Sequence, residues 1–230
     1  GAGGVIIPPK SYFPKIQKVL EKYDVLLVAD EVICGFGRTG NMWGSETFNI
    51  KPDIVTAAKA LSSAYLPISA VIISEKVYGP IKDQANELGI FGHGYTYSAH
   101  PVCAAVAMKA QQIMIDRNII ENVKQLSKLF NERIQNIKNN SWFLSHSRSV
   151  GLIGAVEFGY EGKKKFDIKS KIAAKCAKII QENGVILRAL PGDIIGFCPP
   201  LIIEEEQINE MFDKIDIAFK SFDQMAFNLK

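Results

Sequence analysis

Two ionisable side chains, Asp30 and Lys59, have types and surroundings that suit them for chemistry. Asp30 comes directly after an apolar run, Val25–Ala29, that is typical of a strand buried on both faces. Because ligands of open α/β sheets bind outside the carboxyl ends of the strands, a carboxylate at such a place is a candidate to bind a cationic ligand atom. The alternative is an ordinary turn or helix-capping aspartate.

Lys59 lies in the sequence DIVTAAKAL, where nearly all of its neighbours are apolar. Apolar surroundings disfavour the charged form of a lysine, which makes its amine a better nucleophile. The alternative is a lysine whose alkyl stem covers apolar surface while its ammonium group reaches water. This segment by itself leaves both interpretations open.

The segments around these residues predict the elements that must position them. Residues 11–23 form an amphipathic pattern ahead of the apolar strand, and a helix followed by a buried strand is half of an α/β unit. Residues 70–74 predict a strand and residues 75–82 a helix. The stretch 89–100 is rich in Gly, Tyr and Thr and predicts a functional loop. Pro101 then opens a helix of small apolar residues that we expect to be packed inside the protein.

A change of character near Asp116 predicts a second, smaller α+β portion. In it we expect helices at 119–138, 169–183 and 204–225, and strands at 149–158, 185–187 and 194–198. The sequence therefore predicts two domains, an α/β domain at 1–115 and a smaller α+β domain at 116–230.

The bulk composition is that of an ordinary globular protein. The 230 residues are 47% hydrophobic and 22% charged, and the net charge of +3 is too small to suggest nucleic acid as a partner. None of the four cysteines forms a CxxC pair and no His, Cys and Asp cluster suggests a metal, so we expect reduced thiols in a cytoplasmic protein. No apolar run reaches the length of a membrane span, and we expect no signal peptide. The chain opens with Gly1 rather than Met, as if cut from inside a longer protein.

Taken together, these features resemble the class III aminotransferases, which are pyridoxal-phosphate (PLP) enzymes of fold type I. The matching stretches are PPKSYFPKIQKVLEKYDVLLVADEVICGFGRTG, KPDIVTAAKALSSAYLPISAV and HGYTYSAHPVCAA. The resemblance covers nearly the whole chain, and the spacing from Asp30 to Lys59 is its most specific part. It implies that 1–115 is the C-terminal part of the large PLP-binding domain and that 116–230 is the small C-terminal domain.

The resemblance also implies a role for each candidate site residue. Lys59 would hold the aldehyde of PLP as a Schiff base and then move protons as general base and acid. Asp30 would pair with the ring nitrogen, and Val32 would pack on the ring face. Thr96 would bind the cofactor phosphate of the neighbouring subunit, and Tyr95 would line the same cleft, so a homodimer with shared active sites is implied.

Arg188 resembles the mobile arginine that binds a substrate carboxylate and swings aside for substrates without one. A structural ion pair is the alternative for this residue. We expect Arg38 and Glu31 to be structural. One departure from the family matters: the N-terminal part that carries the principal phosphate-binding turn and the stacking aromatic is not in these residues, so the fragment alone could be inactive.

The leading hypothesis for function is a PLP-dependent transaminase that moves an amino group from an ω-amino acid or amine to pyruvate or a similar keto acid. The stretch YSAHPVCAA, with His100 before Pro101, favours the ω-amino acid–pyruvate branch over the ornithine and acetylornithine branches. Two alternatives stay open. One is a PLP-dependent aminomutase or decarboxylase of the same fold, and the other is a non-catalytic α/β binding protein.

Overall fold

The computed structural model describes residues 1–161 and 164–230, which divide into two compact units. The N-unit is Pro8–Ile120, and the C-unit is Gly1–Ile7 together with Glu121–Lys230. The division differs from the predicted domains in two respects: it falls after Ile120, and the first seven residues belong with the C-unit. They do so because the Nε atom of Arg148 donates hydrogen bonds to two of their carbonyl oxygens. The assignment of 1–115 to a large PLP-binding domain and of 116–230 to a small C-terminal domain stays a prediction.

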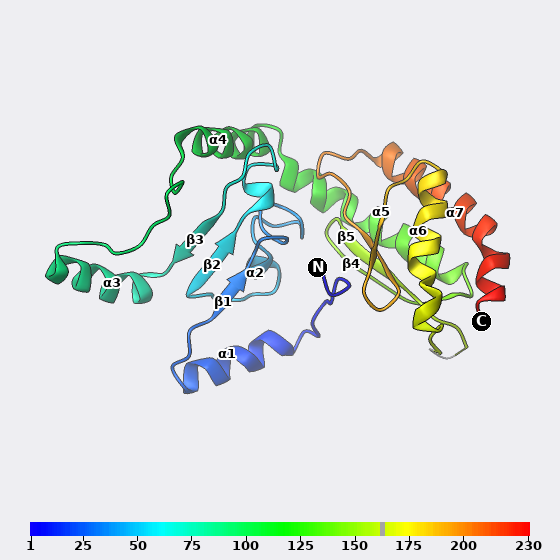
Figure 1. Ribbon diagram of the computed structural model, residues 1–230, viewed down its shortest axis with the longest axis horizontal. Helices are drawn as coiled ribbons and strands as arrows, with labels where there is room; N and C mark the ends of the chain where they lie inside the picture. The colour runs from blue at the N-terminus through cyan, green and yellow to red at the C-terminus, as the bar shows by residue number, and fades with distance from the viewer. Residues whose placement is uncertain (162–163) are drawn as a thin grey trace. The chain divides into compact units, whose positions relative to one another are not determined.

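The N-unit is built on a three-stranded sheet in the order β1 (Val28–Asp30), β2 (Ile54–Ala57) and β3 (Ala70–Ile73) (Figure 1). Strands β1 and β2 are parallel, whereas β3 runs antiparallel to β2. The carboxyl ends of β1 and β2 therefore lie at the same edge of the sheet. The helices of this unit are α1 (Tyr12–Lys22), α2 (Gly44–Thr47), the 3-10 helix η1 (Lys59–Leu61), α3 (Glu75–Leu88) and α4 (Pro101–Asp116).

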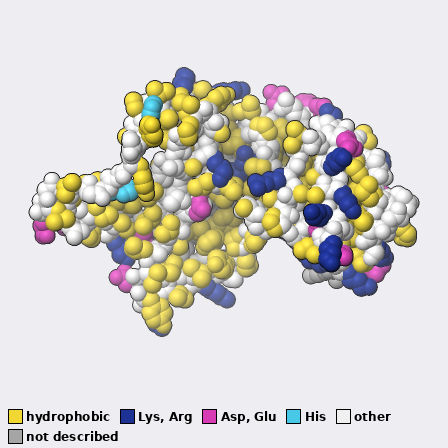
Figure 2. Space-filling view, in the orientation of Figure 1, with side chains coloured by type: hydrophobic (Ala, Val, Ile, Leu, Met, Phe, Trp, Pro, Cys, Tyr) yellow, Lys and Arg dark blue, Asp and Glu magenta, His cyan; other side chains and the backbone are white. Residues whose placement is uncertain are grey.

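The strand predicted at residues 25–29 is shorter and more exposed than expected. It begins at Val28, and the side chains of Val25, Leu26 and Val28 are exposed. Figure 2 shows hydrophobic side chains over much of the visible surface of the N-unit. The expectation of a strand buried on both faces is wrong for this chain, because helices α1 and α3, which are described throughout, bury none of their own residues against the sheet.

Helix α4 is also more exposed than the sequence predicts. Only Ala107, Ala110 and Met114 of this helix are buried, and the apolar side chains of Val102 and Met108 are exposed. The expectation that this helix is packed inside the protein is therefore wrong for α4, because the chain covers one face of it. In the part of the chain that the structure describes, no helix combines the length and hydropathy of a membrane span.

The C-unit contains an antiparallel sheet in the order β4-β5-β7-β6. Its elements are α5 (Ile119–Asn139), of which the first two residues fall in the N-unit, β4 (Leu144–Val150), β5 (Ile153–Phe158), the 3-10 helix η2 (Ile168–Ser170), α6 (Ile172–Glu182), β6 (Arg188–Leu190), β7 (Ile194–Phe197) and α7 (Glu205–Asn228). The single strand predicted at 149–158 is instead the end of β4, a turn at Gly151 and all of β5. The strand predicted at 185–187 begins three residues later, because hydrogen bonds to β7 start at Arg188.

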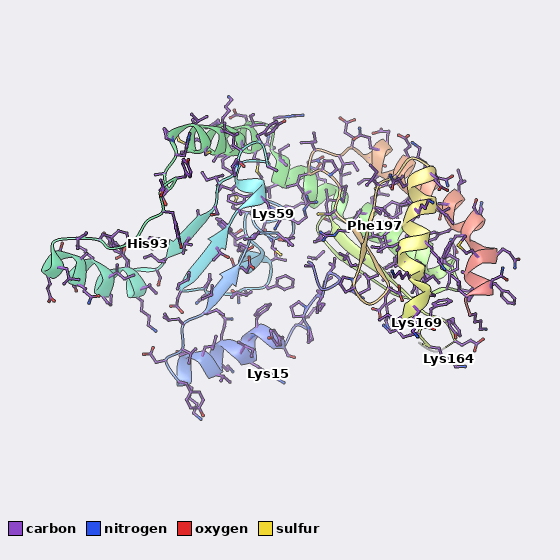
Figure 3. The ribbon with its side chains drawn as sticks, in the orientation of Figure 1. Lys15, Lys59, His93, Lys164, Lys169 and Phe197 are labelled. Atoms are coloured by element: carbon purple, nitrogen blue, oxygen red, sulfur yellow. The ribbon has the colours of Figure 1, made fainter. Side chains whose placement is uncertain are left out.

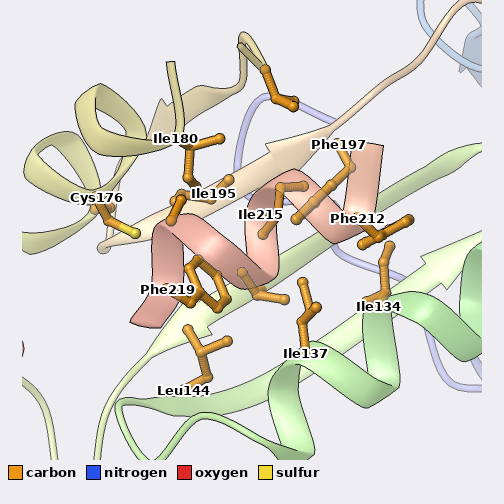
Figure 4. Packing of buried hydrophobic residues seen from close by; sticks show 14 of the residues in the cluster. Ile134, Ile137, Leu144, Cys176, Ile180, Ile195, Phe197, Phe212, Ile215 and Phe219 are labelled. Carbon is orange, nitrogen blue, oxygen red and sulfur yellow. The ribbon is translucent and has the colours of Figure 1, made fainter. Parts of the chain in front are cut away.

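The core of the C-unit joins helices α5, α6 and α7 to one face of this sheet (Figure 4). The rings of Phe197 on β7 and Phe212 on α7 stack at 5.7 Å between centroids, and Phe130 on α5 meets Phe212 edge-on at 5.9 Å. All three side chains are fully buried. Each contributes roughly 1.5–3 kcal/mol of hydrophobic stabilisation, so residues from three distant parts of the sequence hold this unit together.

Candidate active site at the carboxyl ends of β1 and β2

The two ionisable residues singled out in the sequence lie at the same edge of the N-unit sheet. Asp30 is the last residue of β1 and lies opposite Thr56 of β2. Lys59 follows the end of β2 by two residues and begins η1, as Figure 3 shows. Because neighbouring strands are about 4.8 Å apart, the two parallel strands place the backbone of a carboxylate-bearing residue and that of an amine-bearing residue at the same edge of the sheet.

The Asp30 carboxylate is held through one of its oxygens. Its Oδ1 atom accepts a hydrogen bond from the backbone N–H of Val32 at 3.1 Å and another from the hydroxyl of Thr56 at 3.3 Å. Among the described residues, none donates a hydrogen bond to Oδ2. The first bond closes a turn, so Val32 lies in the turn after β1, where it is partly buried.

The backbone at Lys59 is in the left-handed region, with a φ of +47°. This conformation is uncommon for a residue with a side chain and persists where the surrounding structure enforces it. Here the carbonyl oxygen of Lys59 accepts hydrogen bonds from the N–H groups of Ser62 at 3.2 Å and Ala64 at 3.1 Å. Lys59 is exposed, so the apolar surroundings that would make its amine a better nucleophile, one of the two interpretations that the sequence leaves open, are not present in the described chain.

Helix α4 supports the lysine turn through Gln111. The Nε2 atom of this residue donates to the carbonyl oxygens of Ala60 at 3.1 Å and Leu61 at 2.9 Å. Its Oε1 atom is buried and has no hydrogen-bond partner in the described chain. The turn that carries Lys59 is therefore stabilised by hydrogen bonds within its own backbone and by hydrogen bonds from helix α4.

Glu31 supports the turn that follows β1. Its side chain is only 3% exposed and accepts hydrogen bonds from the backbone N–H groups of Gly44 at 2.8 Å and Ser45 at 2.6 Å, at the start of α2. Its own backbone N–H donates to the carbonyl of Thr56 at 2.9 Å. These contacts agree with the structural role that the sequence predicts for Glu31.

The predicted phosphate-binding residues lie elsewhere in the N-unit, on the loop between α3 and α4. Tyr95 is 80% exposed, and its backbone N–H donates to the hydroxyl of Ser98 at 2.9 Å within the same loop. Thr96 is exposed as well. Within the described chain neither residue forms a hydrogen bond with Asp30 or Lys59.

Arg188, the predicted substrate-binding residue, is the first residue of β6 in the C-unit and is exposed. It lies opposite Gly196 of β7. Its side chain forms no ion pair with any described residue, so the alternative of a structural ion pair finds no support in this chain.

Two residues that support this edge, Thr56 and Gln111, are not among the site residues that the sequence predicts. Thr56 carries the one hydroxyl of the segment IVTA, and a lone polar side chain in a short apolar strand is a signal that could have drawn attention to it. Gln111 had no such signal, because a glutamine on a helix is ordinarily a surface residue.

Comparisons with known proteins give this arrangement a family. Residues 1–219 match the family aminotransferase class-III. The chain is 43% identical, over 236 residues, to gamma aminobutyrate transaminase 1, mitochondrial, of Solanum lycopersicum, and the match covers 100% of this chain and 45% of that protein.

Solved structures agree with the sequence comparison. One is described as a transaminase with L-Ala, with 43% identity and a TM-score of 0.94 over 98% of this chain and 53% of that one. Another is the omega transaminase from Pseudomonas jessenii in complex with PMP, with 41% identity and a TM-score of 0.94 over 99% of this chain and 50% of that one. The chain thus spans about half the length of the relatives it matches.

These matches extend over nearly all of the chain at more than 40% identity, and they confirm the predicted resemblance and the α/β architecture of fold type I. With a carboxylate and a lysine at one sheet edge, the chain belongs to the class III aminotransferase family.

Proposed function

We propose that this chain belongs to a PLP-dependent transaminase that moves an amino group from an ω-amino acid or amine to pyruvate or a similar keto acid. The observation that carries the proposal is the placement of Asp30 and Lys59 at the carboxyl ends of two adjacent parallel strands. The relatives support the substrate class. One is named for gamma-aminobutyrate, which is an ω-amino acid, and one is described with L-Ala, which is the amination product of pyruvate.

The residues at this edge fit PLP. The Oδ2 atom of Asp30 accepts no hydrogen bond from the described residues and can accept one from a protonated ring nitrogen. The amine of Lys59 is exposed and can react with an aldehyde. When bound, PLP supplies an electron sink for the carbon that loses its proton.

Each residue has a separate task in this proposal. Lys59 takes the proton from the substrate carbon and returns it as general base and acid. Asp30 keeps the ring nitrogen protonated, because an adjacent negative charge favours the charged form. Val32, in the turn that follows Asp30, borders the ring face.

The remaining predicted residues complete the site from other parts of the protein. Thr96 binds the cofactor phosphate of a neighbouring subunit and Tyr95 lines the same cleft, and the exposure of their loop supports a homodimer with shared sites. Arg188 binds the substrate carboxylate through two parallel hydrogen bonds.

Reduction with borohydride tests the proposal in the full-length protein. Purified protein is expected to be yellow, and reduction should attach the cofactor to the peptide that contains Lys59, as mass spectrometry would show. Lys59→Ala should lose this attachment and all amino transfer, whereas Lys51→Ala, which changes an exposed lysine of the same unit, should retain both.

The substrates distinguish the alternatives. Incubation of the protein with an ω-amino acid and pyruvate should produce L-alanine. Turnover that continues without any keto acid would instead support an aminomutase or a decarboxylase. A colourless wild type that behaves like Lys59→Ala in every assay would support a non-catalytic binding protein.

A further inference from the structure

Thr56 carries a hydroxyl group on a face of the N-unit sheet where the other strand residues, apart from Asp30, are apolar. The alternation of β2 places it on the same face as Ile54. The strand register places it directly between Asp30 of β1 and Val71 of β3. Nothing in the folding of this sheet requires a hydroxyl group there, since valine suits such a position as well as threonine does.

The hydroxyl does have a partner, which is the Asp30 carboxylate. Thr56 Oγ1 donates to Asp30 Oδ1 at 3.3 Å from across the sheet, and the N–H of Val32 donates to the same oxygen at 3.1 Å from along the chain. The torsion that turns an aspartate carboxylate about its last bond has broad minima. Two donors from different directions therefore restrict the rotation of the carboxylate about this bond more than one donor would.

Among the described residues packing does not supply this restraint, because Asp30 is exposed in this chain. Its orientation depends on these two hydrogen bonds among the described residues. Of the two, the bond from Val32 belongs to the backbone turn and is independent of side-chain identity. The bond from Thr56 is the one that the sequence could change.

We infer that Thr56 is a positioning residue whose hydroxyl holds the Asp30 carboxylate in line with the ring nitrogen of bound PLP. The inference rests on the proposed function. It goes further by assigning a role to a residue that does not itself touch the cofactor.

The test compares Thr56→Val and Thr56→Ser in the full-length protein, each freed of cofactor and then titrated with PLP. Thr56→Val keeps the shape of the side chain and lacks the donor, and it should bind PLP about tenfold more weakly, which corresponds to about 1.4 kcal/mol. Thr56→Ser retains the donor and should stay within about twofold of wild type, which is less than half of that free energy. Thr56→Val should also shift the midpoint of the pH-dependent absorbance change of the bound cofactor, and Thr56→Ser should not.

A cofactor analogue shows whether the effect passes through the ring nitrogen. In 1-deaza-PLP a carbon replaces this nitrogen, so the ring has no N–H group that could donate a hydrogen bond to the Asp30 carboxylate. Wild type and Thr56→Val should bind the analogue equally well. In the same way, Thr56→Val should add no further loss in a protein that already carries Asp30→Asn.

Three results would overturn the inference. They are wild-type PLP affinity in Thr56→Val, an equal loss of affinity for PLP and for the analogue, and a loss in Thr56→Ser as large as that in Thr56→Val. If Thr56→Val fails to fold, as judged by its thermal melting, Thr56→Ala gives the same readout without added bulk. A wild type that takes up no PLP at Lys59 would refute the proposed function itself, and the inference with it.

Discussion

Lys59 shows at the scale of one residue how the backbone and the chemistry are connected. Glycine would adopt its left-handed conformation with less strain, yet the position carries a long amine-bearing side chain. Strand β2 ends at Ala57, and the left-handed backbone at Lys59 starts the turn of η1, so Lys59 lies just beyond the edge of the sheet. Gln111 supports that turn from α4.

Arg188 gives a prediction at the same scale. Arg188→Leu should raise the KM for a keto acid by about tenfold or more, since a charge-assisted hydrogen bond contributes about 1.5–3 kcal/mol. The KM for an amine donor that lacks a carboxylate should not change. Arg188→Lys should recover part of the loss, because it restores the charge without the two parallel hydrogen bonds.

Steady-state kinetics with an amino donor that has a carboxylate and with one that lacks it check this prediction. Arg117→Leu is the matched control, since it removes an exposed arginine at the end of α4. An equal rise in KM for donors with and without a carboxylate would contradict a role for Arg188 in carboxylate binding.

At the scale of elements, the short helix α2 depends on a carboxylate that is distant in sequence. Glu31 lies just after β1 and accepts hydrogen bonds from the first N–H groups of α2. A negative charge is favourable at a helix N-terminus. The turn between them also needs glycine at position 35, because a Cβ atom there would lie 2.8 Å from the carbonyl oxygen of Glu31.

Substitution of Glu31 should therefore destabilise the protein. Glu31→Gln leaves one good acceptor for two donors and should lower the free energy of unfolding by about 1–2 kcal/mol. Glu31→Ala leaves both N–H groups unpaired and should cost about 2–3 kcal/mol. Denaturant unfolding measures both values. Glu21→Gln, on the exposed surface of α1, should stay within about 0.5 kcal/mol of wild type, and an equal effect at both positions would refute this account.

At the scale of the whole molecule, an ionic network in the C-unit joins parts of the chain that are far apart in sequence. Arg148 on β4 donates to the carbonyl oxygens of Gly4 at 2.8 Å and Val5 at 2.9 Å, and its Nη1 atom donates to Glu157 on β5 at 3.0 Å. Lys165 also donates to Glu157. Burial by itself raises the pKa of the Glu157 carboxyl, but the hydrogen bonds from Lys165 and Arg148 outweigh it and hold this pKa below its ordinary value of 4.5.

This shift predicts how stability depends on pH. A carboxyl whose pKa is lower in the folded state binds fewer protons there than in the unfolded state, so its contribution is present above about pH 4.5 and is lost as the pH falls through the folded value. Wild type should therefore lose stability on acidification below about pH 4.5. Glu157→Gln should begin less stable at neutral pH and lose less on acidification.

Thermal melting between neutral pH and pH 3 checks this prediction. Glu132→Gln is the control, because Glu132 forms only a surface pair with Lys128 at 3.9 Å. That variant should keep the wild-type acid slope. A Glu157→Gln protein with the same slope as wild type would show that the network does not contribute in this way.

Much of the fold could be predicted from local pattern. The helix predicted at 11–23 is α1 at Tyr12–Lys22, and the helix predicted at 119–138 is α5 at Ile119–Asn139, because the period of apolar residues is a local property. Predictions that depended on partners were less accurate. Burial of the strand at 25–29 needs a covering layer, and the break at Gly151 follows from the pairing of β4 with β5.

The predicted cytoplasmic location and homodimer stay predictions. One relative is named as a mitochondrial protein. The proposed contribution of Thr96 to the site of a neighbouring subunit depends on the predicted homodimer.

The amino-acid sequence by itself determined the types and the spacing of the two central residues. These are Asp30, which follows an apolar run, and Lys59, and neither residue type nor spacing depends on a contact with another part of the chain. Only the tertiary structure decided that Thr56 donates to Asp30, that Gln111 supports the lysine turn and that residues 1–7 belong with the C-unit. The reason is physical: each of these contacts joins residues at least 26 positions apart, and a hydrogen bond at that separation is specified by strand register and helix packing rather than by local pattern.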